Sequence, residues 1–337
     1  MLIKKNSKDS FIIAEVGQNH QGDLKIAKDY IRIFSSIGAN AIKFQIRNNK
    51  YLFSKDAYNG PYESENSFGK TYGLHRERLE LSYNSLKILR KECTKYKVKF
   101  IITPFDEISL SFVRKLNVDA IKIASFDLGN LPFIYKIAKI NKPTIISVGG
   151  GKKDQIKESI KILKKNKNQT ILLHCVSEYP CSFDRLGLYN IKELIRQYPN
   201  LIIGSSDHFN GILSGPVAHL MGARVFEKHV TINRSWVGTD HNFSLEPEGF
   251  KKFVRDIKRV SQMLKPKPNN ELGKEKVFKR LGKSLIASKK IFKGDIFSFD
   301  NLSGRIFSKE FIPVRNANKV IGKKAKKKFN IGDVIES

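Results

Sequence analysis

Eight short apolar runs alternate with amphipathic stretches between residue 11 and about residue 264. The runs, rich in Ile and Val, lie at residues 11–17, 41–46, 98–105, 120–125, 143–149, 169–175, 201–207 and 224–230. Runs without strict alternation are typical of strands covered on both faces, as in a parallel sheet. The stretches between them, such as LKIAKDYIRIFSSIG, have helical spacing. Eight strand–helix units predict a (β/α)8 TIM barrel, because a doubly wound sheet would normally carry a GxGxxG loop, which GQNHQGD lacks.

The pattern changes after residue 264, which ends the predicted barrel domain, residues 1–264. The stretch KPKPNNELGKEK has two prolines and mixed charge, and indicates a linker at residues 265–281. Residues 282–337 contain two similar segments, IFKGDIFS and FNIGDVIE, each built around a turn. They predict a small β-rich domain that is marginally stable alone and packs on something else.

One predicted connection is much longer than the others. It lies between the second and third strands, at residues 51–82, and is rich in Gly, Tyr, Ser and charged residues. Long irregular loops in compact domains are mostly lids or binding loops, so we expect one of these here.

The chain is strongly basic, with 62 Lys and Arg against 32 Asp and Glu and a formal charge of +30. This charge suggests nucleic acid, but the lysines are scattered, and no RNP motif, zinc-finger spacing or helix-turn-helix pattern is present. Nucleic acid is therefore not expected as the main ligand. A basic nucleic-acid-binding protein that uses the KKAKKK run remains the non-enzymatic alternative.

Cysteine usage and hydropathy indicate the compartment. Cys93, Cys175 and Cys181 are too few for a disulfide scaffold, and the odd count suits a reducing compartment. No apolar run approaches the roughly 20 residues that a membrane span needs. The first residues, MLIKKNSKDS, are not followed by the apolar core of a signal peptide. We expect a cytoplasmic protein without a membrane partner.

Polar side chains interrupt the apolar runs near their carboxyl ends, where reactive groups of barrels gather. Because side chains alternate along a strand, Lys43 and Gln45 share one face, as do Ser206 with His208 and Glu227 with His229. Lys122 lies within the run at residues 120–125, and Glu15 lies near the end of the first run. Hydroxyl residues at strand ends are Thr103, Ser125, Ser147 and Ser206.

Two inward lysines require an anion between them, because an unpaired buried charge costs several kcal/mol. Glu15 is the predicted partner, and a closed structural ion pair is one interpretation. Lysines beside a ring of hydroxyl donors also suit the phosphate and carboxylate of a small ligand, and we favour that anion site.

Two histidines fall on neighbouring strand ends, His208 and His229. A lone inward histidine is usually a core residue, as we expect for His174 and His219. Two imidazoles that leave further positions to water or substrate suit Mn²⁺ or a similar divalent ion better than Mg²⁺, which prefers oxygen ligands.

In this order, the motifs resemble the sialic acid (N-acetylneuraminate) synthase family, and its animal-type members most closely. The matching segments are IAEVGQNHQGDLKIAK, AIKFQ, NSFGKTYGLHRERLELS, IKIAS, GSSDH, VFEKHVT, SWVGTDHNFSLEP and LGKSLIASKKI. The resemblance implies a barrel followed by a small antifreeze-like (SAF) domain. It further implies a homodimer in which the SAF domain caps the partner's barrel.

The resemblance also implies an activity and its residues. The activity is the condensation of phosphoenolpyruvate with the open-chain aldehyde of N-acetylmannosamine, with C–O cleavage that releases phosphate, on an enzyme that needs a divalent metal (Mn²⁺, with Mg²⁺ or Co²⁺ as alternatives). Phosphoenolpyruvate would be bound by Lys43, Gln45, Thr103, Lys122, Ser125, Ser147 and Ser206. His208 and His229 would hold the metal. Glu15, Asp127, Tyr179, Glu227 and Asp240 would face the sugar and the reacting centre.

Departures from the family pattern concern the sugar side. Asp127 stands where many bacterial members have Glu, and Ser177 where the family often has Asn. The bacterial Arg–Pro–Gly of the C-terminal domain is missing, and Arg305 is not assigned its role. Two alternative substrates therefore stay open, N-acetylmannosamine 6-phosphate and a diacetamido sugar of the legionaminic acid type.

Overall fold

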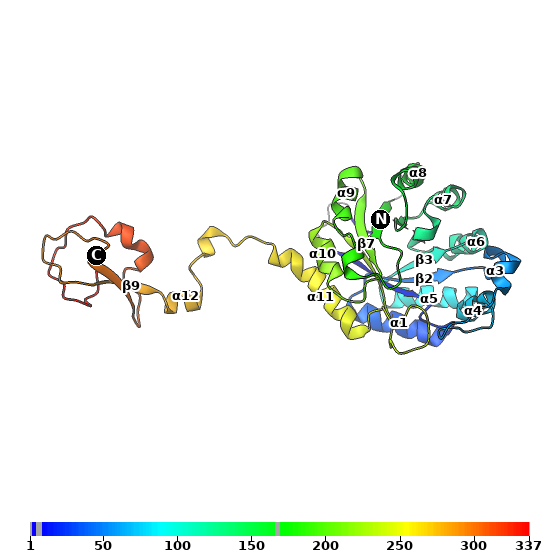
Figure 1. Ribbon diagram of the computed structural model, residues 1–337, viewed down its shortest axis with the longest axis horizontal. Helices are drawn as coiled ribbons and strands as arrows, with labels where there is room; N and C mark the ends of the chain where they lie inside the picture. The colour runs from blue at the N-terminus through cyan, green and yellow to red at the C-terminus, as the bar shows by residue number, and fades with distance from the viewer. Residues whose placement is uncertain (1, 5–8, 166–168, 337) are drawn as a thin grey trace. The chain divides into compact units, whose positions relative to one another are not determined.

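The computed structural model describes every residue except 1, 5–8, 166–168 and 337. It divides the chain into two compact units, residues 1–264 and 265–337 (Figure 1). Among the described residues, no helix is both long enough and apolar enough to cross a membrane.

Eight parallel strands of the first unit close into a barrel in sequence order, with β8 pairing to β1. They are β1 (Phe11–Gly17), β2 (Ala41–Ile46), β3 (Lys99–Pro104), β4 (Ala120–Ile123), β5 (Thr144–Ser147), β6 (Thr170–Cys175), β7 (Ile202–Asp207) and β8 (Val225–His229). Each predicted apolar run contains one of these strands, so the predicted barrel is confirmed.

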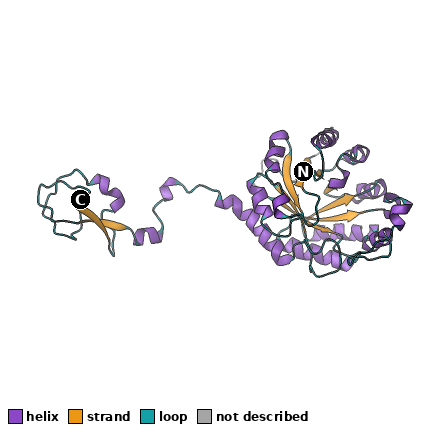
Figure 2. Ribbon diagram, viewed as in Figure 1, coloured by secondary structure: helices purple, strands orange, loops and turns teal. Residues whose placement is uncertain are grey.

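Helices surround the strands of this unit (Figure 2). They are α1 (Leu24–Ile37), α2 (Asn49–Leu52), α3 (Lys55–Asn59), α4 (Tyr72–Leu79), α5 (Tyr83–Lys95), α6 (Glu107–Leu116), α7 (Leu131–Ala138), α8 (Lys153–Lys164), α9 (Asn190–Gln197), α10 (Ser214–Leu220) and α11 (Pro247–Met263), with the 3₁₀ turns η1 (Ser125–Asp127) and η2 (Phe183–Arg185). Side-chain caps fix several starts. The Asp23 carboxylate, for example, accepts a hydrogen bond from the backbone N–H of Ile26 at 2.9 Å.

The sequence predicted a long irregular connection at residues 51–82, between β2 and β3. The structure shows that this segment is partly helical. It contains α3 and α4. Thr71 caps α4, because its hydroxyl accepts a hydrogen bond from Leu74 N at 3.2 Å. Glu80, which directly follows α4, reaches Arg47 just after β2, with 3.0 Å between its Oε1 and Arg47 Nη1.

Two layers fill the barrel interior. The lower layer is apolar and consists of Phe11, Ile13, Ala41, Ile101, Ala120, Ile145, Ile171, Leu173, Ile202 and Val225. Residues of the other parity, such as Ile12 and Ala14, pack outward in the larger core under the helices. Alternation then points the later inward positions of the strands into the upper layer. These positions are the polar residues singled out above, except in β6, which presents Cys175.

The second unit has a core of its own. Strands β9 (Lys283–Ala287) and β10 (Leu302–Ile306) pair antiparallel, and the remaining short elements are η3 (Asn269–Glu271), α12 (Lys276–Arg280) and η4 (Val314–Lys319). The buried apolar residues that pack together in this core are Leu285, Ala287, Ile291, Phe297, Val320, Ala325, Phe329 and Ile335. The segment predicted as a linker contains η3 and α12. Assignment of this unit as an SAF domain stays a prediction.

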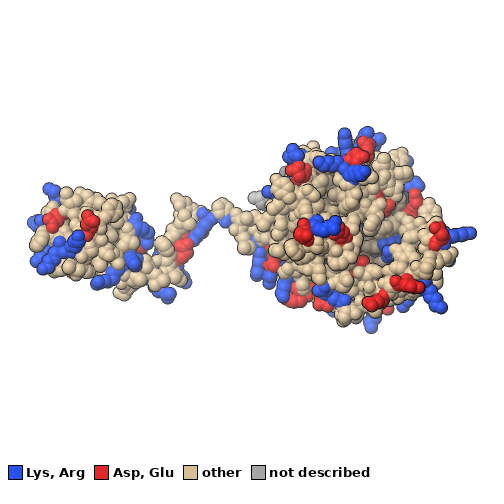
Figure 3. Space-filling view, in the orientation of Figure 1, with Lys and Arg blue, Asp and Glu red and all other residues tan. Residues whose placement is uncertain are grey.

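The repeat seen in the sequence has a structural counterpart. Asp295 accepts a hydrogen bond from Phe292 N at 2.7 Å, and Asp333 accepts one from Asn330 N at the same distance. Each turn therefore closes in the same way, with a carboxylate bound three residues back. Lys and Arg side chains are spread over the visible face of each unit among other residues rather than gathered in one stripe (Figure 3).

Candidate active site

A pocket opens where the carboxyl ends of the strands converge, and all eight strands or the residues directly after them contribute to it. Its lining is Glu15, Lys43, Gln45, Thr103, Phe105, Lys122, Ala124, Ser125, Phe126, Ser147, Cys175, Tyr179, Ser206, His208, Glu227 and His229. Strand register places neighbours side by side, with Glu15 opposite both Lys43 and His229. Residues far apart in sequence thus form one polar site above an apolar layer.

Three of the predicted site residues lie outside this lining. Ser177 stands one layer back and donates a hydrogen bond to Ser125 Oγ at 2.8 Å. Asp240 reaches the edge, with its Oδ2 3.8 Å from His229 Nδ1. Asp127 is half-buried in η1 and accepts a hydrogen bond from Asn130 at 3.0 Å. The other predicted residues are brought together.

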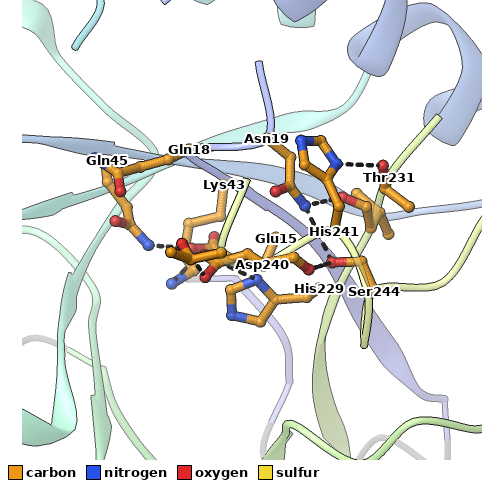
Figure 4. A network of polar contacts seen from close by, with 12 residues as sticks. Glu15, Gln18, Asn19, Lys43, Gln45, His229, Thr231, Asp240, His241 and Ser244 are labelled. Carbon is orange, nitrogen blue, oxygen red and sulfur yellow. Dashed lines mark hydrogen bonds and ion pairs between the residues drawn. The ribbon is translucent and has the colours of Figure 1, made fainter. Parts of the chain in front are cut away.

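An ion cluster lies at the floor of the pocket. Lys43 Nζ is 3.2 Å from Glu15 Oε2 and 3.2 Å from Glu227 Oε1, and Lys122 Nζ is 3.9 Å from Glu227 Oε1. Glu227 is therefore the anion between the two lysines, a place that the sequence analysis gave to Glu15. Glu15 instead contacts Lys43 and accepts a hydrogen bond from Gln45 Nε2 at 2.7 Å (Figure 4).

The two buried carboxyl groups, Glu15 and Glu227, have pKa values shifted in opposite directions. The pKa of Glu15 is raised because desolvation outweighs the attraction of Lys43, and the charge of Glu227 adds to the rise. Burial would also raise the pKa of Glu227, but Lys122, Lys43 and the Ser206 hydroxyl together hold it below its usual range. The cluster therefore keeps Glu227 ionised and leaves Glu15 able to take up a proton near neutral pH.

Lys122 and Ser147 have unused hydrogen-bonding capacity on the pocket wall. Burial lowers the pKa of Lys122 to about 8, and its ammonium donates to Ile123 O at 3.0 Å. The buried Ser147 Oγ has no hydrogen-bond partner among the described residues. Buried polar atoms are normally paired, so these two groups indicate a polar ligand that completes them.

The two imidazoles lie side by side in the pocket lining, with ring centroids 5.4 Å apart and the rings tilted by 57°. Burial lowers the pKa of both histidines, that of His208 to about 4, so both are neutral at physiological pH. His208 Nδ1 lies 2.8 Å from Val176 O. Because a carbonyl only accepts, Nδ1 carries the proton and Nε2 keeps its lone pair.

This pair fits the donor chemistry of a divalent metal site. The buried His229 Nδ1 lacks a hydrogen bond within the part of the chain that the structure describes. Over the same residues no group of three or more His, Cys, Asp or Glu is arranged to hold a metal ion. An ion bound here would thus take two ligands from the protein and the rest from water or substrate.

Sequence reasoning missed four lining residues: Phe105, Ala124, Phe126 and Cys175. Cys175 ends β6 and Phe105 directly follows β3, so the strand-end rule that found the polar residues applies to both. Neither side chain carries the charged group, hydroxyl, amide or imidazole on which the prediction of the other site residues depended. Phe126 follows the predicted run at residues 120–125 and lies in η1, so alternation along a strand does not place its side chain.

Comparison with known proteins shows to which family the chain belongs. The sequence profile of the NeuB family matches residues 30–268. The chain belongs to the NeuB family. It is 36% identical over 315 residues to the N-acetylneuraminate-9-phosphate synthase of Homo sapiens, covering 93% of this chain and 88% of that protein.

Two further NeuB-type relatives agree. The N,N'-diacetyllegionaminic acid synthase of Campylobacter jejuni is 37% identical over 304 residues, covering 88% of this chain and 90% of the relative. The crystal structure of an N-acetylneuraminic acid synthetase from Leptospira borgpetersenii, 32% identical, superposes with a TM-score of 0.69 and covers 79% of this chain and 90% of that one. This NeuB protein is therefore an enzyme of the sugar-acid synthase type, which removes the non-enzymatic alternative.

Proposed function

We propose that the enzyme condenses phosphoenolpyruvate with the open-chain aldehyde of N-acetylmannosamine to form N-acetylneuraminate and phosphate. One observation carries the proposal. A buried lysine, Lys122, lines the same pocket as two neutral imidazoles and the buried Ser147 hydroxyl, which has no hydrogen-bond partner in the described part of the chain. That combination suits an enol phosphate beside a polarised carbonyl group.

Phosphoenolpyruvate occupies the lysine side of the pocket in this proposal. Lys43 and Lys122 supply the positive charge, and the Thr103 hydroxyl, which accepts a hydrogen bond from Lys43 at 3.2 Å, helps to hold that ammonium in place. The remaining proposed contacts to the phosphate and carboxylate are Gln45, Ser125, Ser147 and Ser206. Fixing both anionic groups exposes C3 of the enol toward the aldehyde.

Bond changes follow from that placement. C3 of phosphoenolpyruvate forms the new bond to the aldehyde carbon, and the aldehyde oxygen takes up a proton to become a hydroxyl. Water then adds at C2, and the C2–O bond to phosphate breaks, which leaves a keto group at C2 and releases phosphate. Glu15 has the position and the raised pKa to accept the proton of the attacking water, while the ionised Glu227 offsets positive charge that develops at C2. The sugar lies toward Tyr179 and Asp240, with Asp127 and Ser177 behind the first contacts.

His208 and His229 would hold a divalent ion, with Mn²⁺ favoured over Mg²⁺ because both protein ligands are nitrogen. When bound, such an ion supplies Lewis-acid polarisation of the aldehyde oxygen. Burial lowers the pKa of both imidazoles, so they are unprotonated and able to bind an ion.

The names of the relatives support two alternative sugars. The human relative is named as a 9-phosphate synthase, which favours N-acetylmannosamine 6-phosphate as substrate. The Campylobacter jejuni relative favours a diacetamido sugar. The chemistry at phosphoenolpyruvate is the same in all three cases.

The proposal includes a homodimer in which the C-terminal unit of one chain caps the barrel of the other. Large apolar side chains on loops after the strands support it, since Phe126 is 71% exposed and Phe183 76% exposed. Light scattering should give twice the mass of the chain, and a monomer at working concentration would reject this part.

The experiment for the reaction is direct. Purified protein is incubated with phosphoenolpyruvate, Mn²⁺ and each of the three sugars, while phosphate release is followed and the product is identified by mass spectrometry. Release with one sugar identifies the substrate. No release with any sugar rejects the proposed function.

A further inference from the structure

Arg47 follows β2 directly and continues the inward side of that strand after Lys43 and Gln45. Its side chain is only 7% exposed, and its guanidinium lies 4.0 Å from the ring centre of Phe105, which lines the pocket. Neither the anion site nor the proposed metal site uses this residue. A buried cation at the edge of an active site requires an explanation.

Glu80, the residue that ends α4, holds Arg47 from two sides. Glu80 Oε1 lies 3.0 Å from Arg47 Nη1, and Glu80 Oε2 accepts a hydrogen bond from the backbone N–H of Arg47 at 3.2 Å. The Glu80 side chain is 12% exposed, so the pair is largely shielded from water. Such a pair fixes its members firmly, because either one alone would be a buried charge.

The free end of this pair reaches the pocket through Gln45. Arg47 Nη2 donates to Gln45 Oε1, and Gln45 Nε2 donates to Glu15 Oε1 at 2.7 Å. A guanidinium can only donate and a carboxylate can only accept. One orientation of the Gln45 amide therefore satisfies both neighbours, with its oxygen toward Arg47 and its nitrogen toward Glu15. Figure 4 shows the Gln45–Glu15 side of this path.

We propose that Arg47, held by Glu80, is a positioning residue that fixes the Gln45 amide and, through it, the Glu15 carboxylate. The inference rests on the proposed role of Glu15 in the reaction. Without Arg47 the amide is free to rotate and to present its oxygen to Glu15. Two acceptors would then face each other, and the carboxylate would leave its place beside Lys43.

The insertion between β2 and β3 supports this arrangement through further hydrogen bonds. Glu80 also accepts a hydrogen bond from Gln18 Nε2 at 3.4 Å, and Gln18 Oε1 accepts one from Arg76. Arg76 in turn donates to the Tyr72 hydroxyl from two nitrogens, at 2.7 and 3.0 Å. Helix α4 thus anchors the end of a hydrogen-bonded path that begins at Glu15.

A double-mutant cycle separates positioning through Gln45 from a general loss of structure. The variants are Arg47→Met, Gln45→Met and the double variant. We expect Arg47→Met alone to lower kcat by about tenfold to 100-fold, because small displacements of reacting groups are that costly. In the Gln45→Met background it should change kcat by less than about twofold, since the path is already broken. An equal loss in both backgrounds overturns the proposal.

Matched variants guard against misfolding. Arg90→Met removes an arginine at the other end of the barrel, 3.4 Å from Asp119, and should leave kcat unchanged. Arg47→Lys keeps the charge and a donor nitrogen, although not the planar fork of the guanidinium, and should recover part of the activity. Should Arg47→Met not fold, Glu80→Gln tests the same path, and unchanged kcat in that variant rejects the proposal.

A readout independent of turnover distinguishes this proposal from the proposed function. Crystal structures of the wild type and of Arg47→Met, both without substrate, should differ in the contact between Gln45 Nε2 and Glu15 Oε1. We expect the contact at 2.7 Å in the wild type and its loss in the variant. An intact contact in the variant overturns the inference even if the enzyme proves to use other substrates.

Discussion

Lys228 and Asp207 form a buried ion pair, with 2.7 Å between Nζ and Oδ2, behind the two strands that carry the active-site histidines. The two residues are register partners of β7 and β8, and each directly precedes one of the two histidines in sequence. Asp207 also accepts hydrogen bonds from Ser214 Oγ and from Phe209 N. The ion pair on the outward face of β7 and β8 thus holds the backbone in place, and the same backbone presents His208 and His229 to the pocket.

Removal of Lys228 should destabilise the protein strongly. Lys228→Met leaves the Asp207 carboxylate buried without its cation, which typically costs about 3–5 kcal/mol in the free energy of unfolding. Urea denaturation of the barrel measures the loss. Lys251→Met, which removes an exposed partner of Glu248, should change stability by less than about 1 kcal/mol. Similar small losses in both variants would show that the pair does not brace the barrel.

Glu15→Gln should impair the reaction far more than the fold. The amide keeps the shape of the side chain and can still contact Gln45, and Glu227 still neutralises Lys43. The group that takes the proton is lost, however, so we expect kcat to fall by about 100-fold or more. The phosphate-release assay measures kcat, and thermal unfolding should shift by only a few degrees. Glu248→Gln on the exposed face of α11 is the control and should leave both unchanged. Full activity of Glu15→Gln would remove Glu15 from the mechanism.

Strand positions and the polar layer could be predicted from the sequence because both follow from alternation. Once Ile13 is an inward core residue, Glu15 must point into the same barrel two positions later. The same rule located Lys43, Lys122 and Glu227 without any knowledge of their partners. The alternation of side chains along a strand depends only on neighbouring residues, so it can be read from one sequence.

Partners across the barrel could not be predicted in the same way. Which anion lies between Lys43 and Lys122 depends on the distances across the barrel interior, and the structure gives that place to Glu227. The contact of Arg47 with Glu80 joins residues 33 positions apart, through an insertion whose helices are short and weakly patterned. Such contacts depend on tertiary placement, which composition and periodicity do not encode.

Titration of Lys122 should make kcat/KM for phosphoenolpyruvate fall at alkaline pH. Its ammonium is charged below a pKa that burial lowers to about 8, so the charge is present at pH 7 and is lost as the pH rises through this value. We expect kcat/KM for phosphoenolpyruvate to fall about tenfold per pH unit above that point, because this ratio reports the free enzyme. Lys122→Arg keeps its charge to high pH. Its profile should be flat between pH 7 and 9.5, whatever its absolute rate, and an unchanged alkaline limb in this variant assigns the titration to another group.

Metal dependence should follow the two imidazoles. Both are neutral and buried, so an ion is the natural partner for the nitrogen lone pairs that they present to the pocket. Dialysis against EDTA should abolish phosphate release, and Mn²⁺ should restore it. His229→Ala should weaken Mn²⁺ binding by at least tenfold in equilibrium dialysis, while His219→Ala, at a histidine bonded to Ser10 and Ser261, should leave binding unchanged. Because dialysis measures the ion itself, equal Mn²⁺ binding by the wild type and His229→Ala would place the metal elsewhere, even if the variant were inactive.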